Sequence, residues 1–263
     1  AIEYGRVHDV ERALRVVSVH EILPAARLRP RLIPAVERGM RRSLEGGGGA
    51  NVTLPHKPAA AEVVNELSAR AERARAVNTI VRRSATELYG DNTDGVGLVT
   101  DLVRNLGVAV AGSQLLILGA GGAVRGVLAP LLEQEPREIR VANRTPERAE
   151  RLRDEFSDLG EISASSFDAV DNRPWDIIVN ATAASLAGEV PALPPNAVGP
   201  DTVCYDMAYG RNDTAFMRWA RDRGSERAFK GLGMLVEQAA ERCLLLHGVR
   251  PETRPVMDAL ERL

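Results

Sequence analysis

The sequence predicts an α/β protein, in which a doubly wound parallel sheet follows a smaller α/β unit. Three observations support this fold class. Short apolar runs alternate with segments of helical periodicity, which is typical of parallel sheets covered by helices. A glycine cluster at residues 119–122 directly follows the first of these runs. The length of 263 residues and the hydrophobic content of 44% are sufficient for two domains with separate cores.

The larger sheet is expected within residues 95–230. Buried parallel strands are short and apolar on both faces, whereas the helices between them repeat apolar residues every three or four positions. Because strand and helix alternate in chain order, we expect the strands to be parallel. The expected strands lie at 115–118, 138–145, 175–182 and 202–209, and the expected helices lie at 96–107, 123–132, 146–156 and 214–224.

The smaller unit is expected within residues 1–94. Strand-like segments lie at 49–57 and 76–83, with a predicted helix at 61–74 between them. The four consecutive glycines at 46–49 predict a flexible loop. A final helix is predicted at 233–248, but its periodicity does not indicate which unit it packs against.

Composition and charge exclude several classes of protein. The net charge of -2 and the isoelectric point of 6.2 provide no general attraction to nucleic acids or anionic membranes. No apolar run is long enough to cross a bilayer. Neither the two cysteines, Cys204 and Cys243, nor the four histidines have the spacing of a metal site. We therefore expect a cytoplasmic protein without a metal, acting on a small molecule as a monomer or a homodimer.

The sequence GAGGAVRG at 119–126 predicts a phosphate-binding turn between a strand and a helix. Gly119 and Gly121 allow a tight turn, and the N-terminus of the following helix offers free N–H groups to an anion. Val124 stands where the G-x-G-x-x-G motif has its third glycine. An ordinary tight turn is the alternative, but the strand–glycine–helix setting favours a dinucleotide.

The end of the second strand indicates which dinucleotide binds. NAD sites carry a carboxylate there, about 20 residues after the glycines. This sequence instead has Asn143, Arg144 and Thr145, followed by Arg148. Guanidinium groups bind phosphate oxygens through paired hydrogen bonds, so the sequence predicts NADP. The alternative is that both arginines pair with acidic residues of their own helix, Glu147 or Glu150.

Two charged residues are candidates for proton transfer. Lys57 follows Pro55 at the end of a predicted strand, and Asp94 lies in the turn-like sequence GDNTDG at 90–95. A carboxylate beside an ammonium holds it in place, and such a pair can move a proton when a hydroxyl and a ketone interconvert. The alternative is an exposed lysine and a turn aspartate.

Eight motifs together resemble the shikimate dehydrogenase family. They run from about residue 50 to the C-terminus in the family's order: NVTLPHK, AVNT, GDNTDGVG, GAGGA, NRTPERA, VNAT, YDMAY and GMLVEQA. The resemblance implies reduction of 3-dehydroshikimate to shikimate with NADPH, in chorismate and aromatic amino acid biosynthesis. It also implies a substrate-binding domain at 1–94, completed by helices within 231–263, and a Rossmann-type NADP-binding domain at 95–230.

The resemblance implies roles for individual residues. Lys57 and Asp94 are expected to be the catalytic pair. The residues expected to contact the substrate are Thr53, Asn78, Tyr209 and Gln238. Without the resemblance, Asn78 and Gln238 would be interpreted as a turn amide and an exposed helix amide. The residues expected to bind NADP are Gly119, Ala120, Gly121, Gly122, Ala123, Asn143, Arg144, Thr145, Arg148, Ala181, Thr182, Met207 and Gly231.

The sequence departs from the family pattern in two places. The segment NATAASLAG at 180–188 differs from the family's usual continuation after NAT. Residues 1–49 lack the Gly-x-Pro turn and the Ser-x-Ser pair that bind the substrate carboxylate in the family, which leaves Ser18 as an isolated candidate. Because a buried carboxylate needs donors, we expect weak shikimate binding beside normal NADP binding.

Two alternatives to a shikimate dehydrogenase follow from the same sequence. One is the same scaffold acting on quinate or another hydroxylated cyclohexane acid. The other is a non-catalytic dinucleotide-binding relative with an impaired substrate domain. The presence of both Lys57 and Asp94 argues against the second alternative, whereas the unusual N-terminal region argues for it.

Overall fold

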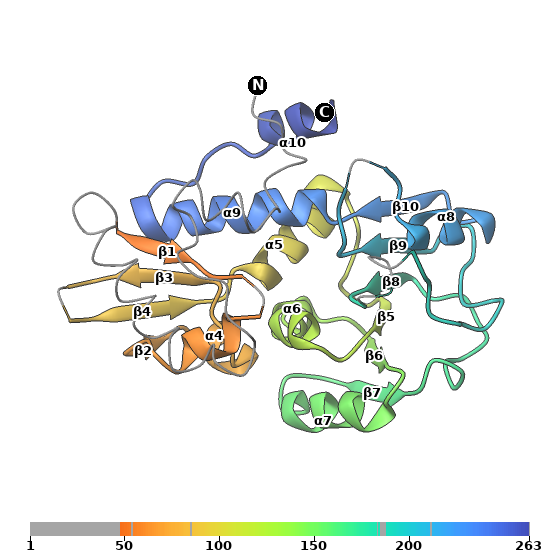
Figure 1. Cartoon of the computed structure of the whole chain (residues 1–263). Coiled ribbons are helices and arrows are strands. Elements are labelled where there is room, and N and C mark those ends of the chain that lie inside the picture. Colours follow the sequence, from red (N-terminus) through yellow and green to blue (C-terminus); the bar gives the residue numbers. More distant parts are fainter. Residues whose placement is uncertain are drawn as a thin grey trace. The chain divides into compact units, whose positions relative to one another are not determined.

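The structure is a computed structural model that describes residues 48–53, 55–84, 86–182, 184, 188–210 and 212–262. The chain divides into two units, Ala1–Gly47 and Gly48–Leu263. All of the helices and strands described below belong to the second unit, which contains two separate sheets (Figure 1). Within the described residues, no helix combines the length and the apolar character needed to cross a membrane.

The smaller sheet has four strands in the order β1-β3-β4-β2. Strand β3 (Thr79–Arg82) is antiparallel to both β1 (Gly49–Asn51) and β4 (Leu88–Asp91), and β2 (Glu66–Leu67) is parallel to β4. The prediction of a flexible glycine loop is wrong at Gly49, which lies in β1. A Cβ atom at this position would stand 2.1 Å from the carbonyl oxygen of Ile80, so the close approach of the two strands requires glycine.

The predicted helix at 61–74 is wrong in its middle. Two short helices, α3 (Lys57–Ala61) and α4 (Ala69–Ala74), are separated there by β2. Ser68 is the N-cap of α4, and its side chain accepts a hydrogen bond from the Ala71 N–H at 3.1 Å. The first predicted strand is also shorter than expected, so that Lys57 begins a helix, with Pro58 in the first turn, where its missing N–H costs nothing.

The larger sheet has six parallel strands in the order β10-β9-β8-β5-β6-β7. The strands are β5 (Gln114–Leu118), β6 (Glu138–Ala142), β7 (Ile162–Ser165), β8 (Ile177–Asn180), β9 (Val203–Asp206) and β10 (Arg227–Lys230). The chain builds outward from β5 to β7 and then returns to β8, on the other side of β5. This is the Rossmann arrangement, so the predicted fold class is confirmed. Its ligand crevice lies beyond the strand ends where the order reverses, at β5 and β8.

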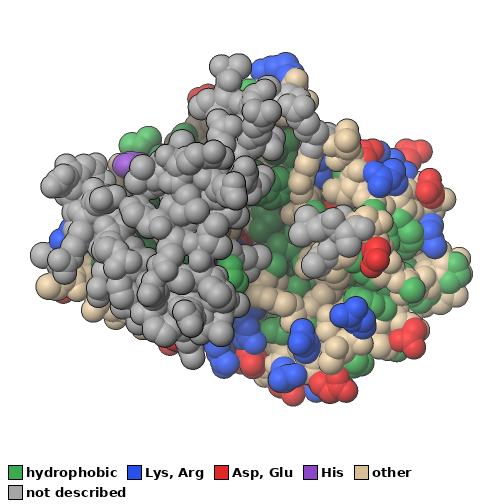
Figure 2. Space-filling model, viewed as in Figure 1, with side chains coloured by type: hydrophobic (Ala, Val, Ile, Leu, Met, Phe, Trp, Pro, Cys, Tyr) green, Lys and Arg blue, Asp and Glu red, His purple; other side chains and the backbone are tan. Residues whose placement is uncertain are grey.

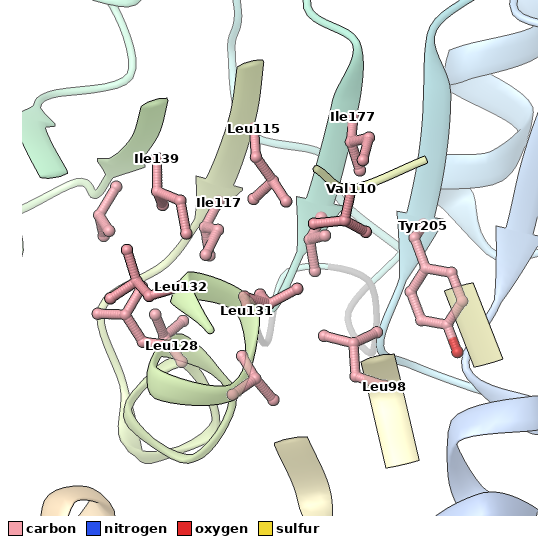
Figure 3. Packing of buried hydrophobic residues seen from close by; sticks show 14 of the residues in the cluster. Leu98, Val110, Leu115, Ile117, Leu128, Leu131, Leu132, Ile139, Ile177 and Tyr205 are labelled. Carbon is pink, nitrogen blue, oxygen red and sulfur yellow. The ribbon is translucent and has the colours of Figure 1, made fainter. Parts of the chain in front are cut away.

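Helices α6 (Gly122–Leu132), α7 (Pro146–Phe156) and α8 (Ala215–Asp222) connect the strands of this sheet. Before β5, the helix α5 (Asp94–Thr100) continues as a π-helical turn, η3 (Asp101–Asn105). Figure 3 shows the core between sheet and helices, where strand residues such as Leu115 and Ile139 pack with Leu128 of α6 and Leu98 of α5. All four side chains are fully buried, and such burial is the main favourable contribution to stability.

The C-terminal helix α9 (Leu232–His247) packs along α5 and also contacts β3, so it connects the two sheets (Figure 1). Two glycines make this close packing possible. A Cβ atom at Gly97 of α5 would lie 2.8 Å from Cβ of Gln238, and one at Gly233 of α9 would lie 1.9 Å from Asp101 Oδ1. A last helix, α10 (Arg254–Glu261), was not predicted.

Candidate active site

Lys57 and Asp94 form an ion pair in the structure. Lys57 Nζ donates to Asp94 Oδ2 at 2.5 Å, and the two side chains are 19% and 14% exposed. Lys57 is the first residue of α3 and Asp94 the first of α5, so two helix starts bring them together across 37 residues of sequence. The pair is sheltered but reachable from solvent, as a proton-transferring group needs to be.

Asn78 fixes the other oxygen of Asp94. Its Nδ2 donates to Asp94 Oδ1 at 2.8 Å and to Thr93 Oγ1 at 3.1 Å. Its Oδ1 accepts from the Thr93 N–H at 3.0 Å and from Thr79 Oγ1 at 2.8 Å. Asn78 is only 2% exposed, so the amide works chiefly as an internal support for Asp94. This support depends on long-range side-chain hydrogen bonds, which periodicity in the sequence does not reveal.

The other predicted substrate residues lie differently. Gln238, on α9, accepts a hydrogen bond from Thr93 Oγ1 at 3.4 Å and donates from Nε2 to the carbonyl of Leu235 at 2.9 Å. Thr53 is exposed, and Tyr209 is 52% exposed. Within the described part of the chain, neither side chain forms a hydrogen bond to Lys57 or Asp94. Ser18 lies outside the described residues.

The glycine turn at the end of β5 leaves the start of α6 open. Gly119 adopts a φ of +107°, and a Cβ atom there would lie 3.2 Å from the carbonyl oxygen of Ala181, so this position requires glycine. Gly121 precedes the first turn of α6, whose N–H groups receive no side-chain cap. Among the described residues, no atom comes within 4 Å of a Cβ built at Gly121 or Gly122. Free N–H groups facing open space suit a pyrophosphate.

The end of β6 carries free positive charge. Arg144, Thr145 and Arg148 are exposed, and Asn143 Nδ2 donates to the carbonyl of Thr145 at 2.8 Å. Among the residues that the structure describes, neither arginine forms an ion pair, with Glu147, Glu150 or any other acid. Figure 2 shows Lys and Arg side chains gathered over the part of the molecule that contains α7. Two unpaired guanidiniums fit the 2′-phosphate of NADP.

The remaining predicted cofactor residues meet at the ends of β8, β9 and β10. The N–H of Met207 donates to the carbonyl of Asn180 at 2.9 Å, and the N–H of Gly231 donates to the carbonyl of Ala208 at 3.0 Å. Thr182 Oγ1 donates to Asn180 Oδ1 at 2.7 Å. A Cβ atom at Gly231 would lie 2.6 Å from the carbonyl oxygen of Met207. These backbone segments therefore border the strand ends where a Rossmann sheet binds its cofactor.

Comparison with known proteins identifies a family that matches this chain. The family model for the shikimate dehydrogenase substrate binding domain matches residues 24–80, and the model for shikimate / quinate 5-dehydrogenase matches residues 101–190. The shikimate dehydrogenase (NADP(+)) of Methylococcus capsulatus is 50% identical over 226 residues, covering 86% of this chain and 81% of the relative. That of Alkalilimnicola ehrlichii is 53% identical over 215 residues, covering 82% and 79%. This chain belongs to the shikimate dehydrogenase family.

A solved structure shares the fold of this chain. The Ael1 enzyme from Pseudomonas putida is 41% identical and has a TM-score of 0.80. The match covers 85% of this chain and 82% of the Ael1 chain.

The match to the family models begins earlier in the sequence than the motifs predicted. The motifs began at about residue 50, whereas the substrate-domain model begins at residue 24 and includes Lys57 and Asn78.

Proposed function

We infer that this protein is an NADP-dependent dehydrogenase that reduces 3-dehydroshikimate to shikimate and catalyses the reverse reaction. The observation that carries the inference for this chain is the Lys57–Asp94 ion pair, at 2.5 Å, in the same compact unit as the open glycine turn. The sequence relatives named above support the substrate and the cofactor. The protein thus belongs to the route toward chorismate and the aromatic amino acids.

Lys57 handles the proton of the reaction. Bound NADPH supplies a hydride, with its two electrons, to the carbonyl carbon of 3-dehydroshikimate. The ammonium of Lys57 donates a proton to the carbonyl oxygen, which becomes the hydroxyl of shikimate, and its amine accepts that proton in the reverse direction. Asp94 keeps Nζ in place, and Asn78 keeps Asp94 in place through the bond to Oδ1. Preorganised contacts of this kind need no rearrangement during the reaction.

The substrate lies beside this pair, held by groups around it. Thr53, Gln238 and Tyr209 contact the hydroxyl groups and the open side of the ring. Asn78 acts on the substrate through Asp94, because its own N–H groups and its oxygen already form hydrogen bonds within the protein. The substrate-binding domain comprises residues 1–94 together with 231–263. The contact of α9 with β3 supports the inclusion of this helix, which also packs along α5 of the cofactor domain. All proposed groups come from one chain, so the proposal holds for a monomer and for a homodimer.

The cofactor lies across the carboxyl ends of β5 and β8. The residues Gly119–Ala123 surround the pyrophosphate, and Asn143–Thr145 with Arg148 bind the adenosine 2′-phosphate. Ala181, Thr182, Met207 and Gly231 border the nicotinamide half. We place the protein in the cytoplasm, because Cys204 and Cys243 are free. Burial raises the pKa of the Cys204 thiol to about 12, so this thiol takes no part in the chemistry.

The deciding experiment is a spectrophotometric assay of NADP reduction by the purified protein, with shikimate and quinate compared at equal concentrations. We expect turnover with shikimate and NADP, and much weaker turnover with NAD. If the protein prefers quinate, the proposed reaction type stands, but the substrate is quinate and not shikimate. Binding of NADP without turnover of either acid would indicate the non-catalytic alternative.

A further inference from the structure

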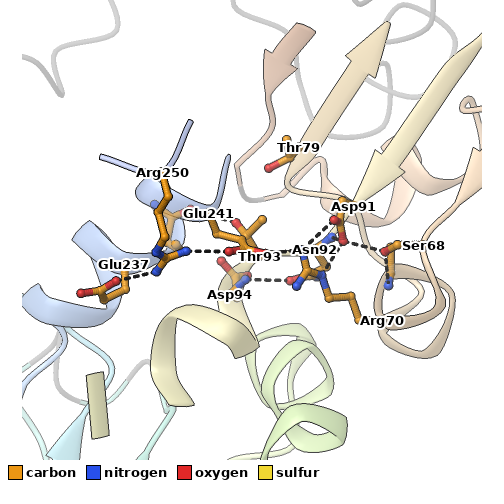
Figure 4. Close-up of polar contacts among 12 residues, drawn as sticks. Ser68, Arg70, Thr79, Asp91, Asn92, Thr93, Asp94, Glu237, Glu241 and Arg250 are labelled. Atoms are coloured by element: carbon orange, nitrogen blue, oxygen red, sulfur yellow. Dashed lines mark hydrogen bonds and ion pairs between the residues drawn. The ribbon is translucent and has the colours of Figure 1, made fainter. Parts of the chain in front are cut away.

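Arg70 and Asp91 form an ion pair close to the Lys57–Asp94 site (Figure 4). Asp91 ends β4 and is 2% exposed. Arg70 Nε and Nη2 donate to Asp91 Oδ1 and Oδ2, both at 2.7 Å, in the planar two-bond geometry that arginine alone provides. Ser68 Oγ and the N–H of Asn92 also donate to Oδ1, each at 2.6 Å. Four donors thus hold one buried carboxylate.

From Asp91 the chain reaches the catalytic Asp94 in three residues, and the side chains between them are anchored. Asn92 Nδ2 donates to the carbonyl of Ala76 at 3.0 Å, and its Oδ1 accepts from the N–H of Asp94 at 3.1 Å. Asn92 and Thr93 are 1% and 0% exposed. A shift of the Asp91 carboxylate would therefore be transmitted to Asp94, because the segment has no free side chain to absorb it.

Arg70 also connects this segment to α9. Its Nη2 donates to Glu241 Oε1 at 3.1 Å, and Glu241 Oε2 accepts from Arg250 Nη1 at 2.6 Å. Arg250 Nη2 in turn donates to Glu237 Oε2 at 2.7 Å, and Glu237 is 2% exposed. Glu241 lies three residues after Gln238, which is about one helical turn. The same guanidinium thus contacts the strand end that leads to Asp94 and the helix that carries Gln238.

We propose that Arg70 is a positioning residue for the reaction, which fixes Asp94 through Asp91 and fixes the Gln238 part of α9 through Glu241. This inference rests on the proposed function, since it acts through Lys57 and Asp94. A purely structural ion pair would affect only the stability of the fold. A positioning role requires a loss of turnover at temperatures where the variant is fully folded, because small displacements of a catalytic group cost large factors in rate.

The first test replaces Arg70 and compares turnover well below the unfolding temperature. We expect Arg70→Gln to lower kcat for shikimate by about 10- to 100-fold, while KM for NADP stays within about twofold. Arg70→Lys keeps the charge but not the two-bond geometry, so it should recover part of the loss. The matched control is Arg73→Gln on the same helix, because Arg73 pairs with exposed Asp158 and, among the described residues, forms no ion pair with a member of this network. Wild-type kcat in folded Arg70→Gln would overturn the proposal.

The second test asks whether Arg70 acts through Asp94. In an Asp94→Asn background, adding Arg70→Gln should lower kcat by a further factor of less than about three. The reason is that both changes remove the same contribution of Asp94 to turnover. Loss of the full 10- to 100-fold in both backgrounds would overturn the proposal. Full activity of Asp94→Asn alone would overturn the catalytic assignment, and the inference with it, without reference to any Arg70 variant.

The third test covers the case in which Arg70→Gln does not fold. Glu241→Gln leaves the Arg70–Asp91 pair intact and weakens the ion pairs that Glu241 forms with Arg70 and with Arg250. We expect this variant to raise KM for shikimate by about 3- to 10-fold with a smaller change in kcat, since Gln238 is placed on the substrate. The control is Glu252→Gln, at an exposed position outside the network. Unchanged KM and kcat in Glu241→Gln would contradict the coupling to α9.

Discussion

The hydroxyl of Tyr205 donates a hydrogen bond to Asp101 Oδ2 at 2.7 Å and thereby joins β9 to η3. Tyr205 is fully buried, and Asp101 is 3% exposed. Burial raises the pKa of the Asp101 carboxyl above its ordinary value of 3.8, although the hydrogen bonds from Tyr205 and Asn105 oppose this shift. The charged form of Asp101 is therefore less favourable in the folded protein than in the unfolded chain.

The first prediction concerns the pH dependence of stability. Because the pKa is raised in the folded state, the folded protein retains a proton that the unfolded chain releases as the pH rises above 3.8. The free energy of unfolding therefore decreases as the pH rises above 3.8. The decrease ends once the carboxyl of Asp101 has ionised in the folded protein as well. We expect the Tm of Asp101→Asn minus that of the wild type to increase as the pH rises from about 3.5 to 7.

Thermal unfolding at several pH values would measure this difference. Loss of an acceptor for Tyr205 lowers the Tm of the variant at every pH, so only the trend of the difference is diagnostic. A difference that stays constant or decreases with pH would contradict the raised pKa.

The second prediction concerns the catalytic pair. Lys57→Ala or Asp94→Ala should lower kcat by about 10²- to 10⁴-fold, the usual scale for the loss of a proton-transferring group. NADP affinity should stay near that of the wild type, because neither residue is placed on the cofactor. Steady-state kinetics beside a binding titration would check both statements, with Arg83→Ala in the same unit as the control. Wild-type turnover in both variants would place the chemistry elsewhere.

The third prediction concerns the choice of cofactor. Arg144 and Arg148 form no ion pair among the described residues, so their removal breaks no ion pair in that part of the chain. The double variant Arg144→Ala/Arg148→Ala should bind NADP about 100-fold more weakly, at roughly tenfold per lost charged hydrogen bond, and bind NAD as before. Arg151→Ala on the same helix is the control, since its Nε donates to the Glu147 carbonyl. Equal losses for both cofactors would argue against a 2′-phosphate site.

The fourth prediction separates the two roles of glycine in the turn. Gly119 has a left-handed φ of +107°, so Gly119→Ala should lower both Tm and NADP affinity. Gly121 has a φ of -96° with open space around it, so Gly121→Ala should fold with an unchanged Tm. If the pyrophosphate lies against this backbone, the added methyl group should still lower NADP affinity by about tenfold or more. Unchanged affinity in Gly121→Ala would argue against that placement of the pyrophosphate.

Much of the larger sheet was predictable because its inner strands are continuous apolar runs. The two edge strands were missed for a physical reason. Strand β7 reads ISAS and β10 reads RAFK, and neither has the buried run of an inner strand. In the smaller sheet, β2 has only two residues and lies within a sequence pattern that favours a helix. Its pairing with β4 overrides that pattern.

The candidate site was predictable only in part. The family motifs indicated Lys57, Asp94 and the glycine turn, and the structure brings the two charged residues together. Arg70 and Asp91 were missed because their contact depends on two side chains 21 residues apart in the sequence. Asn78 was predicted as a substrate residue, but spacing in the sequence could not show that its amide supports Asp94 from inside.

The position of α9 has a consequence for how the protein is made. Thr93 meets Gln238 across 145 residues of sequence, so the ribosome must synthesise almost the whole chain before the two can touch. Until then, the face of α5 that α9 covers, including the surface around Gly97, has no partner. The nascent chain therefore presents this helix face without α9 until residues 232–247 have been made, and incompletely packed surfaces of this kind are what chaperones bind. Termination at residue 231 should yield an aggregation-prone fragment, even though every described strand of both sheets has already been made.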